Sequence, residues 1–353
     1  MAENQVLDWI TDANTCFLMG AGCSVTAGKP LIDDLTERIV KQLKPPATVL
    51  FKNLEGINGR PPTIEDLLNQ CLQIKNLITS RKVKKDADWT LEKCVEVINS
   101  ILCQIVDEVG GDWACSGIHE RFLRRIASHT QRKTCDIFSL NYDVVLEATL
   151  ESLRFPYTDG FSGAENAHFE ASLFMGEQRR TPFFRLYKLH GSVNWFRDPD
   201  QCVRRRPYKK GEPGDRLVIY PCEQKYYQTQ YGVYEVLLTR FRERLRESRP
   251  NNKLVILGCS LADEHITEAI LDSLSAPGNN LTVYALVGPG NDVQAQIARF
   301  QDLVDRSDNR LNVMVGHEAF LGRALEDKEW SALKNADYWV FDNLVNALTG
   351  GKA

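Results

Sequence analysis

Short runs of apolar residues, each bounded by glycine or polar turn residues, are the sequence feature that most constrains the fold of this chain. Several of these runs are unbroken rather than alternating, which is typical of parallel strands that helices cover on both faces. We expect strands at residues 16–19, 135–140, 186–189, 217–220, 254–257, 281–287 and 311–315.

Amphipathic helical patterns lie between these runs. Apolar residues recur there every three or four positions, as they do on the buried face of a helix. The stripes consist of Leu31, Leu35, Ile39 and Leu43, then of Ile266, Ile270 and Leu274, and then of Val293, Ile297, Phe300 and Val304. Strands that alternate with helices predict an α/β fold with a Rossmann-like, open and mostly parallel sheet and helices on both of its faces.

Two long stretches interrupt this alternation. We expect residues 1–353 to form a single domain, with a Rossmann-like core at residues 14–44 and 131–353. Residues 45–130 show helical patterns without a strong strand and predict a helical insertion, whereas the mixed aromatic, proline and basic segments of residues 155–250 predict a loop-rich insertion. The basic clusters at residues 178–180, 204–206 and 209–210 are interpreted as solvated surface, with contact to an acidic ligand or partner as the alternative.

The charge and hydropathy of the chain exclude several classes of protein. Its 43 Lys and Arg residues face 47 Asp and Glu residues, which gives a formal net charge of −4 and disfavours direct nucleic-acid binding. No apolar run approaches the roughly 18 residues that cross a bilayer, and the N-terminal residues lack the layout of a secretion signal. We therefore expect a soluble, cytoplasmic protein without membrane contact.

The ten cysteines are scattered singly, no two of them form a CxxC pair, and the six histidines are not spaced like metal ligands. A disulfide framework is typical of short secreted chains rather than of long cytoplasmic ones. We therefore expect reduced and mostly buried thiols and no metal site, structural zinc included.

A glycine turn follows the first predicted strand. The segment Gly20-Ala21-Gly22-Cys23-Ser24 leads toward an amphipathic helix, and a strand, a glycine turn and a helix start form the usual anion cradle of dinucleotide folds. Without side chains, the backbone N–H groups of such a turn can approach a pyrophosphate. The segment is neither a GxGxxG fingerprint nor a Walker loop, so a turn that merely packs the strand on the helix is the alternative.

Three later strands also end in residues that can carry chemistry. Asn141 and Asp143 follow the second strand, where they could bind a ligand or cap the next helix. His190 follows the third strand and is a candidate general base or a structural histidine. Gly258 and Ser260 break a further strand, with Asp263 and His265 beyond them, and this small-residue turn could accept a ribose and adenine or be only a strand end.

The ordered combination of GAGxS, NYD, LHGS and GxSLxD, over residues from about 14 to 320, resembles the sirtuin family of NAD⁺-consuming proteins. The resemblance implies that Gly20, Ala21, Gly22 and Ser24 hold the pyrophosphate and the nearby ribose, and that Gly258 and Ser260 contact the adenosine half. It also implies that Asn141 positions water or the nicotinamide ribose, that Asp143 holds the nicotinamide carboxamide, and that His190 is the catalytic histidine.

The chain also departs from the protein deacylases of this family. Those proteins carry a four-cysteine zinc module after the catalytic histidine, where this chain has only Cys202 and Cys222 before Gly258. They also place Asp-Phe-Arg after the first glycine segment, where this chain has Leu31-Ile32-Asp33-Asp34. The NYD and LHGSVNW forms instead look like the zinc-less sirtuin-like effectors of bacterial antiphage systems, which hydrolyse NAD⁺.

The resemblance thus implies an NAD⁺ hydrolase that takes NAD⁺ as its substrate, uses no zinc and acts in antiphage defence. A protein deacylase or ADP-ribosyltransferase is one alternative, and a non-catalytic scaffold that senses NAD⁺ or ADP-ribose is another. Because unregulated hydrolysis would kill the host, we expect control by assembly. The expected assembly is a homo-oligomer or a complex with a separate partner chain, such as the HerA-type ATPase or the short Argonaute that accompany relatives of this kind.

Overall fold

The computed structural model describes residues 2–55, 61–80, 89–110, 117–175, 183–198, 200, 202–207, 216–218, 232–323 and 333–351. Its centre is an eight-stranded sheet with the strand order β13-β12-β11-β10-β1-β2-β6-β3. Every neighbouring pair is parallel except β12 and β13, which are antiparallel. The strands are β1 (Thr15–Met19), β2 (Thr134–Ser139), β3 (Tyr157–Thr158), β6 (Phe183–Lys188), β10 (Lys253–Leu257), β11 (Thr282–Val287), β12 (Leu311–Val315) and β13 (Ala319–Leu321).

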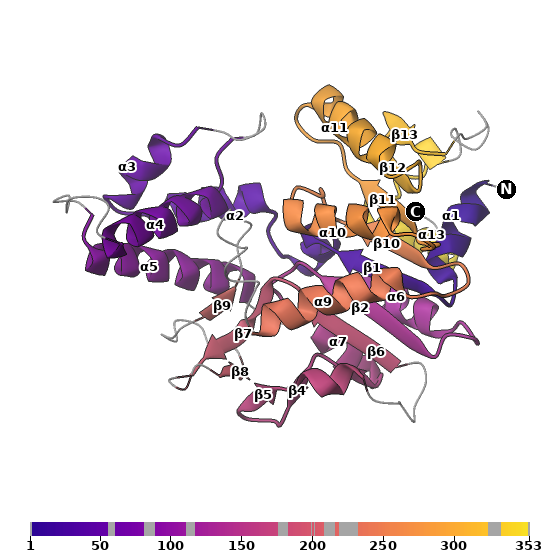
Figure 1. Ribbon diagram of the computed structural model, residues 1–353, viewed down its shortest axis with the longest axis horizontal. Coiled ribbons are helices and arrows are strands. Elements are labelled where there is room, and N and C mark those ends of the chain that lie inside the picture. Colours follow the sequence, from indigo (N-terminus) through magenta and orange to yellow (C-terminus); the bar gives the residue numbers. More distant parts are fainter. Residues whose placement is uncertain are drawn as a thin grey trace.

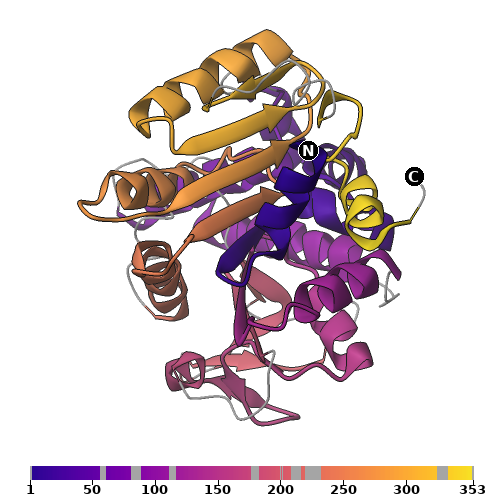
Figure 2. The ribbon, with the colours of Figure 1, turned by 90° about the vertical axis from the view of Figure 1, so that its right-hand side faces the viewer.

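Helices cover both faces of this sheet (Figure 2). One face packs against α9 (Val233–Arg246), α10 (Glu264–Ser275) and α11 (Val293–Arg306). The opposite face packs against α1 (Ala2–Thr11), α6 (Gly117–Ala127), α7 (Val145–Leu153) and α13 (Phe341–Thr349). The predicted class, an α/β fold with a Rossmann-like and mostly parallel sheet, is confirmed.

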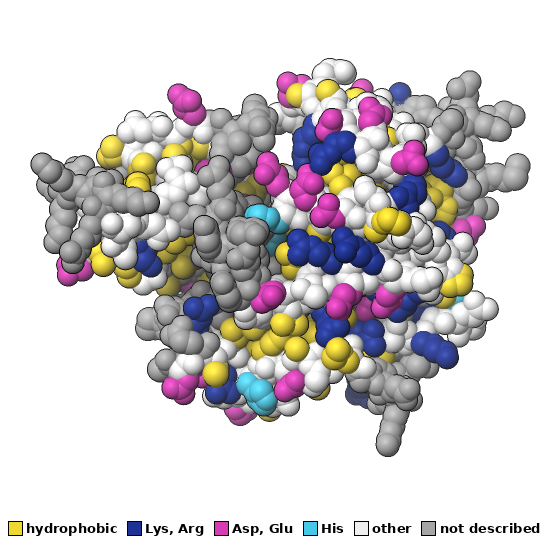
Figure 3. All heavy atoms as spheres, viewed as in Figure 1, with side chains coloured by type: hydrophobic (Ala, Val, Ile, Leu, Met, Phe, Trp, Pro, Cys, Tyr) yellow, Lys and Arg dark blue, Asp and Glu magenta, His cyan; other side chains and the backbone are white. Residues whose placement is uncertain are grey.

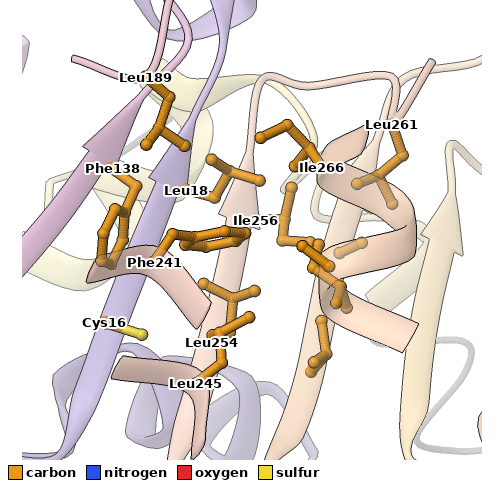
Figure 4. Packing of buried hydrophobic residues seen from close by; sticks show 14 of the residues in the cluster. Cys16, Leu18, Phe138, Leu189, Phe241, Leu245, Leu254, Ile256, Leu261 and Ile266 are labelled. Carbon is orange, nitrogen blue, oxygen red and sulfur yellow. The ribbon is translucent and has the colours of Figure 1, made fainter. Parts of the chain in front are cut away.

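Six strands of this sheet are buried at all of their positions or at all but one, because both of their faces carry apolar side chains: β1, β2, β6, β10, β11 and β12. Alternate residues of β1 serve the two layers: Cys16 and Leu18 pack toward α9 and α10, whereas Phe17 and Met19 pack toward α6. Figure 4 shows the first layer, where Phe241 of α9 lies among Leu18, Phe138 and Ile256. Burying a side chain of this size contributes about 1.5–3 kcal/mol, so the unbroken apolar runs directly stabilise a sheet between two layers.

A separate helical lobe lies beside the sheet and contains α2 (Ile32–Val40), α3 (Ala47–Lys52), α4 (Ile64–Thr79) and α5 (Leu91–Gly110) (Figure 1). Thr63 and Asp66 form a capping box at the start of α4 and so fix where this helix begins. The lobe has an apolar cluster of its own, which Val144 and Val193 of the main body join. These two residues flank the predicted site segments, so the lobe is packed directly against that region.

Residues 155–250 contain more regular structure than their sequence predicts. Besides β6 and α9 they include an antiparallel five-stranded sheet with the order β4-β5-β8-β7-β9. Its strands are β4 (Phe161–Ser162), β5 (Ala167–Phe169), β7 (Gly191–Arg197), β8 (Val203–Arg205) and β9 (Arg216–Val218). β4, β5 and β8 have only two or three residues each and are too short to show a periodicity, which is why the sequence does not predict them.

Six of the seven predicted strand runs match strands of the parallel sheet, namely β1, β2, β6, β10, β11 and β12. The run at 217–220 is different: its first part belongs to β9, which pairs antiparallel with β7, and residues 219 and 220 lie outside the described part of the chain. An apolar run specifies a strand but not its neighbour, and here the neighbour is a strand of the second sheet.

The basic cluster at 204–206 is tied to its own sheet. Arg204 pairs with Asp198 at 2.8 Å, Arg205 pairs with Asp159, and the Arg206 guanidinium lies 3.6 Å from the centroid of the Phe196 ring. The clusters at 178–180 and 209–210 lie outside the described residues. Figure 3 shows acidic and basic side chains interspersed on the face in view, without a field of a single sign.

Within the described part of the chain, no helix combines the length and the apolar character needed to cross a membrane. The eight cysteines that the structure describes are all free thiols, and five of them are buried: Cys16, Cys23, Cys71, Cys94 and Cys135.

Candidate active site

The predicted site segments follow four strands that are neighbours in the sheet, in the order β10-β1-β2-β6. The chain runs from β1 to β2 and β6 on one side and later returns to β10 on the other side of β1. The carboxyl ends of β1 and β10 therefore form a topological switch point, which is where open α/β sheets bind ligands. Because all four strands are parallel, their carboxyl ends lie on one edge of the sheet.

The glycine turn after β1 packs backbone to backbone against the loop after β10. A Cβ atom on Gly20 would lie 2.5 Å from the carbonyl oxygen of Gly258, and one on Gly22 would lie 2.8 Å from the Cα of Gly258. Gly258 has a φ of +60°, and its own Cβ would lie 2.5 Å from the Cys23 nitrogen. Only glycine fits at the three positions, and the two loops form one continuous rim.

This packing uses two of the backbone N–H groups that the sequence assigns to a pyrophosphate. The Gly20 N–H donates to the Leu257 carbonyl, and the Gly22 N–H donates to the Gly258 carbonyl, both at 2.9 Å. The helical turn η1 (Ala21–Ala27) begins here, with Ala21 exposed and Ser24 buried. The packing role of the glycines, which the sequence left as an alternative, is therefore present in the structure.

Asn141 connects the end of β2 to the glycine turn. Its side-chain Nδ2 donates to the Gly20 carbonyl at 3.0 Å and to Ser24 Oγ at 2.9 Å. Because a carbonyl only accepts, the nitrogen must face Gly20, and the orientation of the amide follows. The Asn141 Oδ1 atom is buried and has no hydrogen-bond partner among the described residues. Asn141 is thus a fixed amide whose acceptor lone pairs are still available.

Asp143 is buried and serves the start of α7, because its Oδ1 accepts from the Val145 N–H at 3.0 Å. Asp143 thus satisfies the first N–H of α7 from one position before the N-cap residue Val144, which has no side-chain cap of its own. Between Asn141 and Asp143, the Tyr142 carbonyl accepts from the Val193 N–H at 2.9 Å and from Ser192 Oγ at 3.2 Å. The Tyr142 hydroxyl lies 3.4 Å from a carboxylate oxygen of Glu65 in α4, so the turn also contacts the helical lobe.

His190 lies on the same edge of the sheet as Asn141. Ser139 and Lys188 are register partners in β2 and β6, and Asn141 and His190 each lie two residues beyond them. The ring centroids of Tyr142 and His190 are 6.4 Å apart. The side chain of His190 is buried, and its Nε2 lies 2.9 Å from Asp263 Oδ2.

Asp263 is the site residue that the sequence did not assign. Its Oδ1 caps α10 by accepting from the N–H groups of His265 at 3.0 Å and Ile266 at 3.3 Å, while its Oδ2 faces His190. A carboxylate that accepts from Nε2–H selects the tautomer whose basic nitrogen is Nδ1. The Asp before a predicted helix was a visible capping signal, but nothing in the sequence indicates its histidine partner.

Ser260 is exposed and lies on a loop that α11 braces. Arg299 donates to the Leu261 carbonyl and, at 3.4 Å, to the Ser260 carbonyl. Leu261 has a φ of +55°, and its carbonyl also accepts from Thr267 Oγ1 at 3.0 Å. The loop between Gly258 and Asp263 is thus held in a defined shape beside the glycine turn.

A second buried histidine, His119 of α6, lies close to the same region. It interacts with the backbone carbonyl of Cys23 and with the charge of Asp143, and burial lowers the pKa of its imidazole despite the nearby Asp143 and Asp342 carboxylates. Its Nδ1 has no hydrogen-bond partner among the described residues. The sequence did not single out His119, because a histidine on the apolar face of a helix is ordinarily structural.

Comparison with known proteins agrees with this arrangement. Residues 136–305 match the family model described as a SIR2-like domain, a segment that contains Asn141, His190, Gly258 and Asp263 but begins after the glycine turn. A search of the curated proteins finds no match. In the part of the chain that the structure describes, no three His, Cys, Asp or Glu side chains gather as a metal-ligand group.

Proposed function

We propose that this chain is an NAD⁺ hydrolase, and the match of residues 136–305 to a SIR2-like domain supports an NAD-utilising enzyme. The proposed reaction breaks the N-glycosidic bond between nicotinamide and ribose and consumes one water. The products are nicotinamide, ADP-ribose and one proton. The observation that carries the proposal is the pairing, on one edge of the sheet, of a fixed amide with an available acceptor and an imidazole backed by a carboxylate.

Several features of the described residues support the binding of a dinucleotide. The rim formed by Gly20, Gly22 and Gly258 has no side chains that would block a close approach from the switch point. Ala21 and Ser24 at the start of η1 and Ser260 after β10 complete the proposed contacts to the pyrophosphate, the ribose and the adenosine half. The buried Asn141 Oδ1 lacks a partner, and a water or a ribose hydroxyl would supply the missing donor.

Cleavage of the glycosidic bond passes through an oxocarbenium-like state, so the site must stabilise positive charge at the ribose and admit one nucleophile. We assign the orientation of the attacking water to Asn141 Oδ1, which accepts one of its protons. Asp143 is assigned to the carboxamide of nicotinamide, a contact that would share the carboxylate with its hydrogen bond to the Val145 N–H.

His190 is the proposed general base. Its Nδ1 would take the proton from the attacking water or from a ribose hydroxyl, and Asp263 would stabilise the imidazolium that forms. General-base assistance contributes roughly 10²–10⁴-fold. The loop that holds the adenosine half would thereby also orient the base, since Gly258, Ser260 and Asp263 belong to one braced segment.

The test is an NAD⁺ turnover assay with chromatographic identification of the products. The wild type should release nicotinamide and ADP-ribose without a protein acceptor, which a deacylase or an ADP-ribosyltransferase would require. His190→Ala should lose about 10²-fold or more of this turnover, while His168→Ala, which removes an exposed histidine of β5, should retain it. Tight NAD⁺ binding without turnover would favour the non-catalytic scaffold instead.

We further propose that assembly controls the hydrolase, because unregulated hydrolysis would deplete the NAD⁺ of the cell that makes the enzyme. The proposed role is a cytoplasmic antiphage effector that acts as a homo-oligomer or with a partner chain such as a HerA-type ATPase or a short Argonaute. Light scattering of the purified protein tests the first form. A strict monomer with full activity would contradict control by assembly.

A further inference from the structure

A buried ion pair contacts the turn that carries the proposed catalytic amide. The Lys188 side chain, at the end of β6, is 1% exposed, and its Nζ lies 3.4 Å from Glu147 Oε1 in the first turn of α7. Fully buried lysines are rare unless they are paired, and such a pair is weak evidence for stability because both charges lose their hydration. A role other than stability is therefore worth seeking for this pair.

The lysine makes a second contact that reaches the site. Its Nζ donates to the backbone carbonyl of Asp143. Lys188 itself lies two residues before His190, and Asp143 lies two residues after Asn141. One ammonium group thus connects the strand that carries the imidazole with the turn that carries the amide.

The other attachments of the two segments differ in kind. Asn141 is held by neutral hydrogen bonds to Gly20 and Ser24 of the first loop. The Tyr142 carbonyl accepts from the Val193 N–H and from Ser192 Oγ, which are also neutral donors. The Asp143 carbonyl, by contrast, accepts from the charged Lys188 side chain. A charge-assisted hydrogen bond is stronger than a neutral one. Glu147 supplies the counter-charge, and its Oε2 has no partner among the described residues.

We propose that Lys188 is a positioning residue that fixes the spacing between the Asn141–Asp143 turn and His190. The proposal rests on the proposed NAD⁺ hydrolysis, to which it adds a residue that touches neither substrate nor water. Misplacing catalytic groups by about 1 Å can cost on the order of 10²-fold in rate. Loss of the Lys188 contact should therefore lower kcat on the order of 10–100-fold and leave KM for NAD⁺ within about threefold.

Two variants separate positioning from stability. Lys188→Met leaves the Glu147 carboxyl buried without its cation and should lower Tm. Lys188→Met combined with Glu147→Leu removes both charges, which is often neutral or stabilising for a buried pair, so Tm should recover. Turnover should stay low in the double variant, because the Asp143 carbonyl still lacks its donor. Turnover that recovers together with Tm would overturn the proposal.

A third variant keeps the proposal testable if the Lys188 variants do not fold. Glu147→Gln removes the counter-charge and retains the bond from Lys188 to Asp143, so kcat should stay within about threefold of the wild type. A loss of turnover of about tenfold or more in Glu147→Gln would assign the effect to the ion pair and contradict the role of the carbonyl contact. Lys253→Met, which breaks the pair with Asp12 at the opposite end of β10, is the matched control and should retain kcat.

Hydrogen–deuterium exchange gives a readout that does not depend on catalysis. The amides of residues 141–148 should exchange faster in the double variant than in the wild type at matched Tm, whereas unchanged exchange would refute the positioning role. A wild type that fails to turn over NAD⁺ would refute the hydrolase alone, because the exchange comparison would still decide what Lys188 does.

Discussion

The side-chain amide of Asn141 donates to Ser24 Oγ at 2.9 Å across 117 positions of sequence. The same nitrogen donates to the Gly20 carbonyl at 3.0 Å, so the ends of β1 and β2 are joined by one side chain. Because both donors of the amide are used, its oxygen is turned away from the glycine turn. This relationship makes Asn141 both a structural tie and the candidate ligand for water, and the two roles can be separated experimentally.

Removal of the amide should abolish turnover with a moderate effect on the fold. Asn141→Ala loses the proposed water acceptor and two hydrogen bonds, each of which contributes about 0.5–1.5 kcal/mol. Ser24→Ala loses only one of these bonds and keeps the amide. We expect NAD⁺ turnover to fall by about 10²-fold or more in Asn141→Ala and by less than tenfold in Ser24→Ala. Asn53→Ala, an exposed position after α3, serves as the control. Equal turnover in all three variants would contradict the role of Asn141.

The carboxylate behind His190 should matter for rate and for its dependence on pH. Asp263→Asn retains a carbonyl oxygen that can cap α10 but cannot stabilise an imidazolium as a carboxylate does. We expect kcat to fall roughly 10–10³-fold and the acidic limb of the kcat profile to move to lower pH, because the imidazole loses a group that favours its protonated form. The measurement is the pH profile of turnover together with Tm. An acidic limb at the wild-type pH would show that Asp263 does not influence the protonation of the base.

The close approach of the two glycine loops predicts that even a methyl side chain at Gly22 disturbs the rim. Its Cβ in Gly22→Ala would lie 2.8 Å from the Gly258 Cα, so the rim must open by several tenths of an ångström. We expect a lower Tm and weaker binding of ADP-ribose in calorimetry. Gly117→Ala, at the start of α6, meets no atom within 4 Å and should leave both unchanged or raise Tm slightly. Normal binding by Gly22→Ala would argue against a ligand at this rim.

Glu147 should make stability fall with rising pH. Burial raises the pKa of this carboxyl from 4.5 to about 7, although Lys188 opposes the shift, while the nearby Asp143 and Asp159 add to it. A group with a raised pKa in the folded state favours folding below its unfolded pKa, and this contribution disappears as pH rises through the folded pKa. Between pH 5 and pH 8 the wild type should therefore lose at most about 3 kcal/mol relative to Glu147→Gln. Denaturant unfolding at several pH values measures the difference, and parallel curves would show that Glu147 does not titrate in this range.

Much of the architecture follows from short-range patterns. The unbroken apolar runs of β1, β2, β6, β10, β11 and β12 and the apolar stripes of α2, α10 and α11 are local properties of the chain, and they determine a helix-covered parallel sheet. The order of the polar segments that follow these strands can also be read from the sequence. The likeness to sirtuins rests on that order, and the family match covers residues 136–305.

Contacts between distant segments could not be predicted in the same way. The pairing of His190 with Asp263 spans 73 positions, and the fit of Gly22 against Gly258 depends on β1 and β10 being neighbours. The placement of β9 in the second sheet and the burial of Lys188 against Glu147 depend likewise on which elements pack together.

Six strands of the parallel sheet, the helices α2, α10 and α11 and the residue types that follow these strands can be read from the local sequence, because hydrophobic periodicity and turn chemistry act over a few residues. Which of those residues meet depends on the fold as a whole, since strand order and loop packing result from burial summed over the whole chain. Three contacts depend on the fold in this way: His190 with Asp263, Asn141 with Gly20, and Lys188 with Asp143.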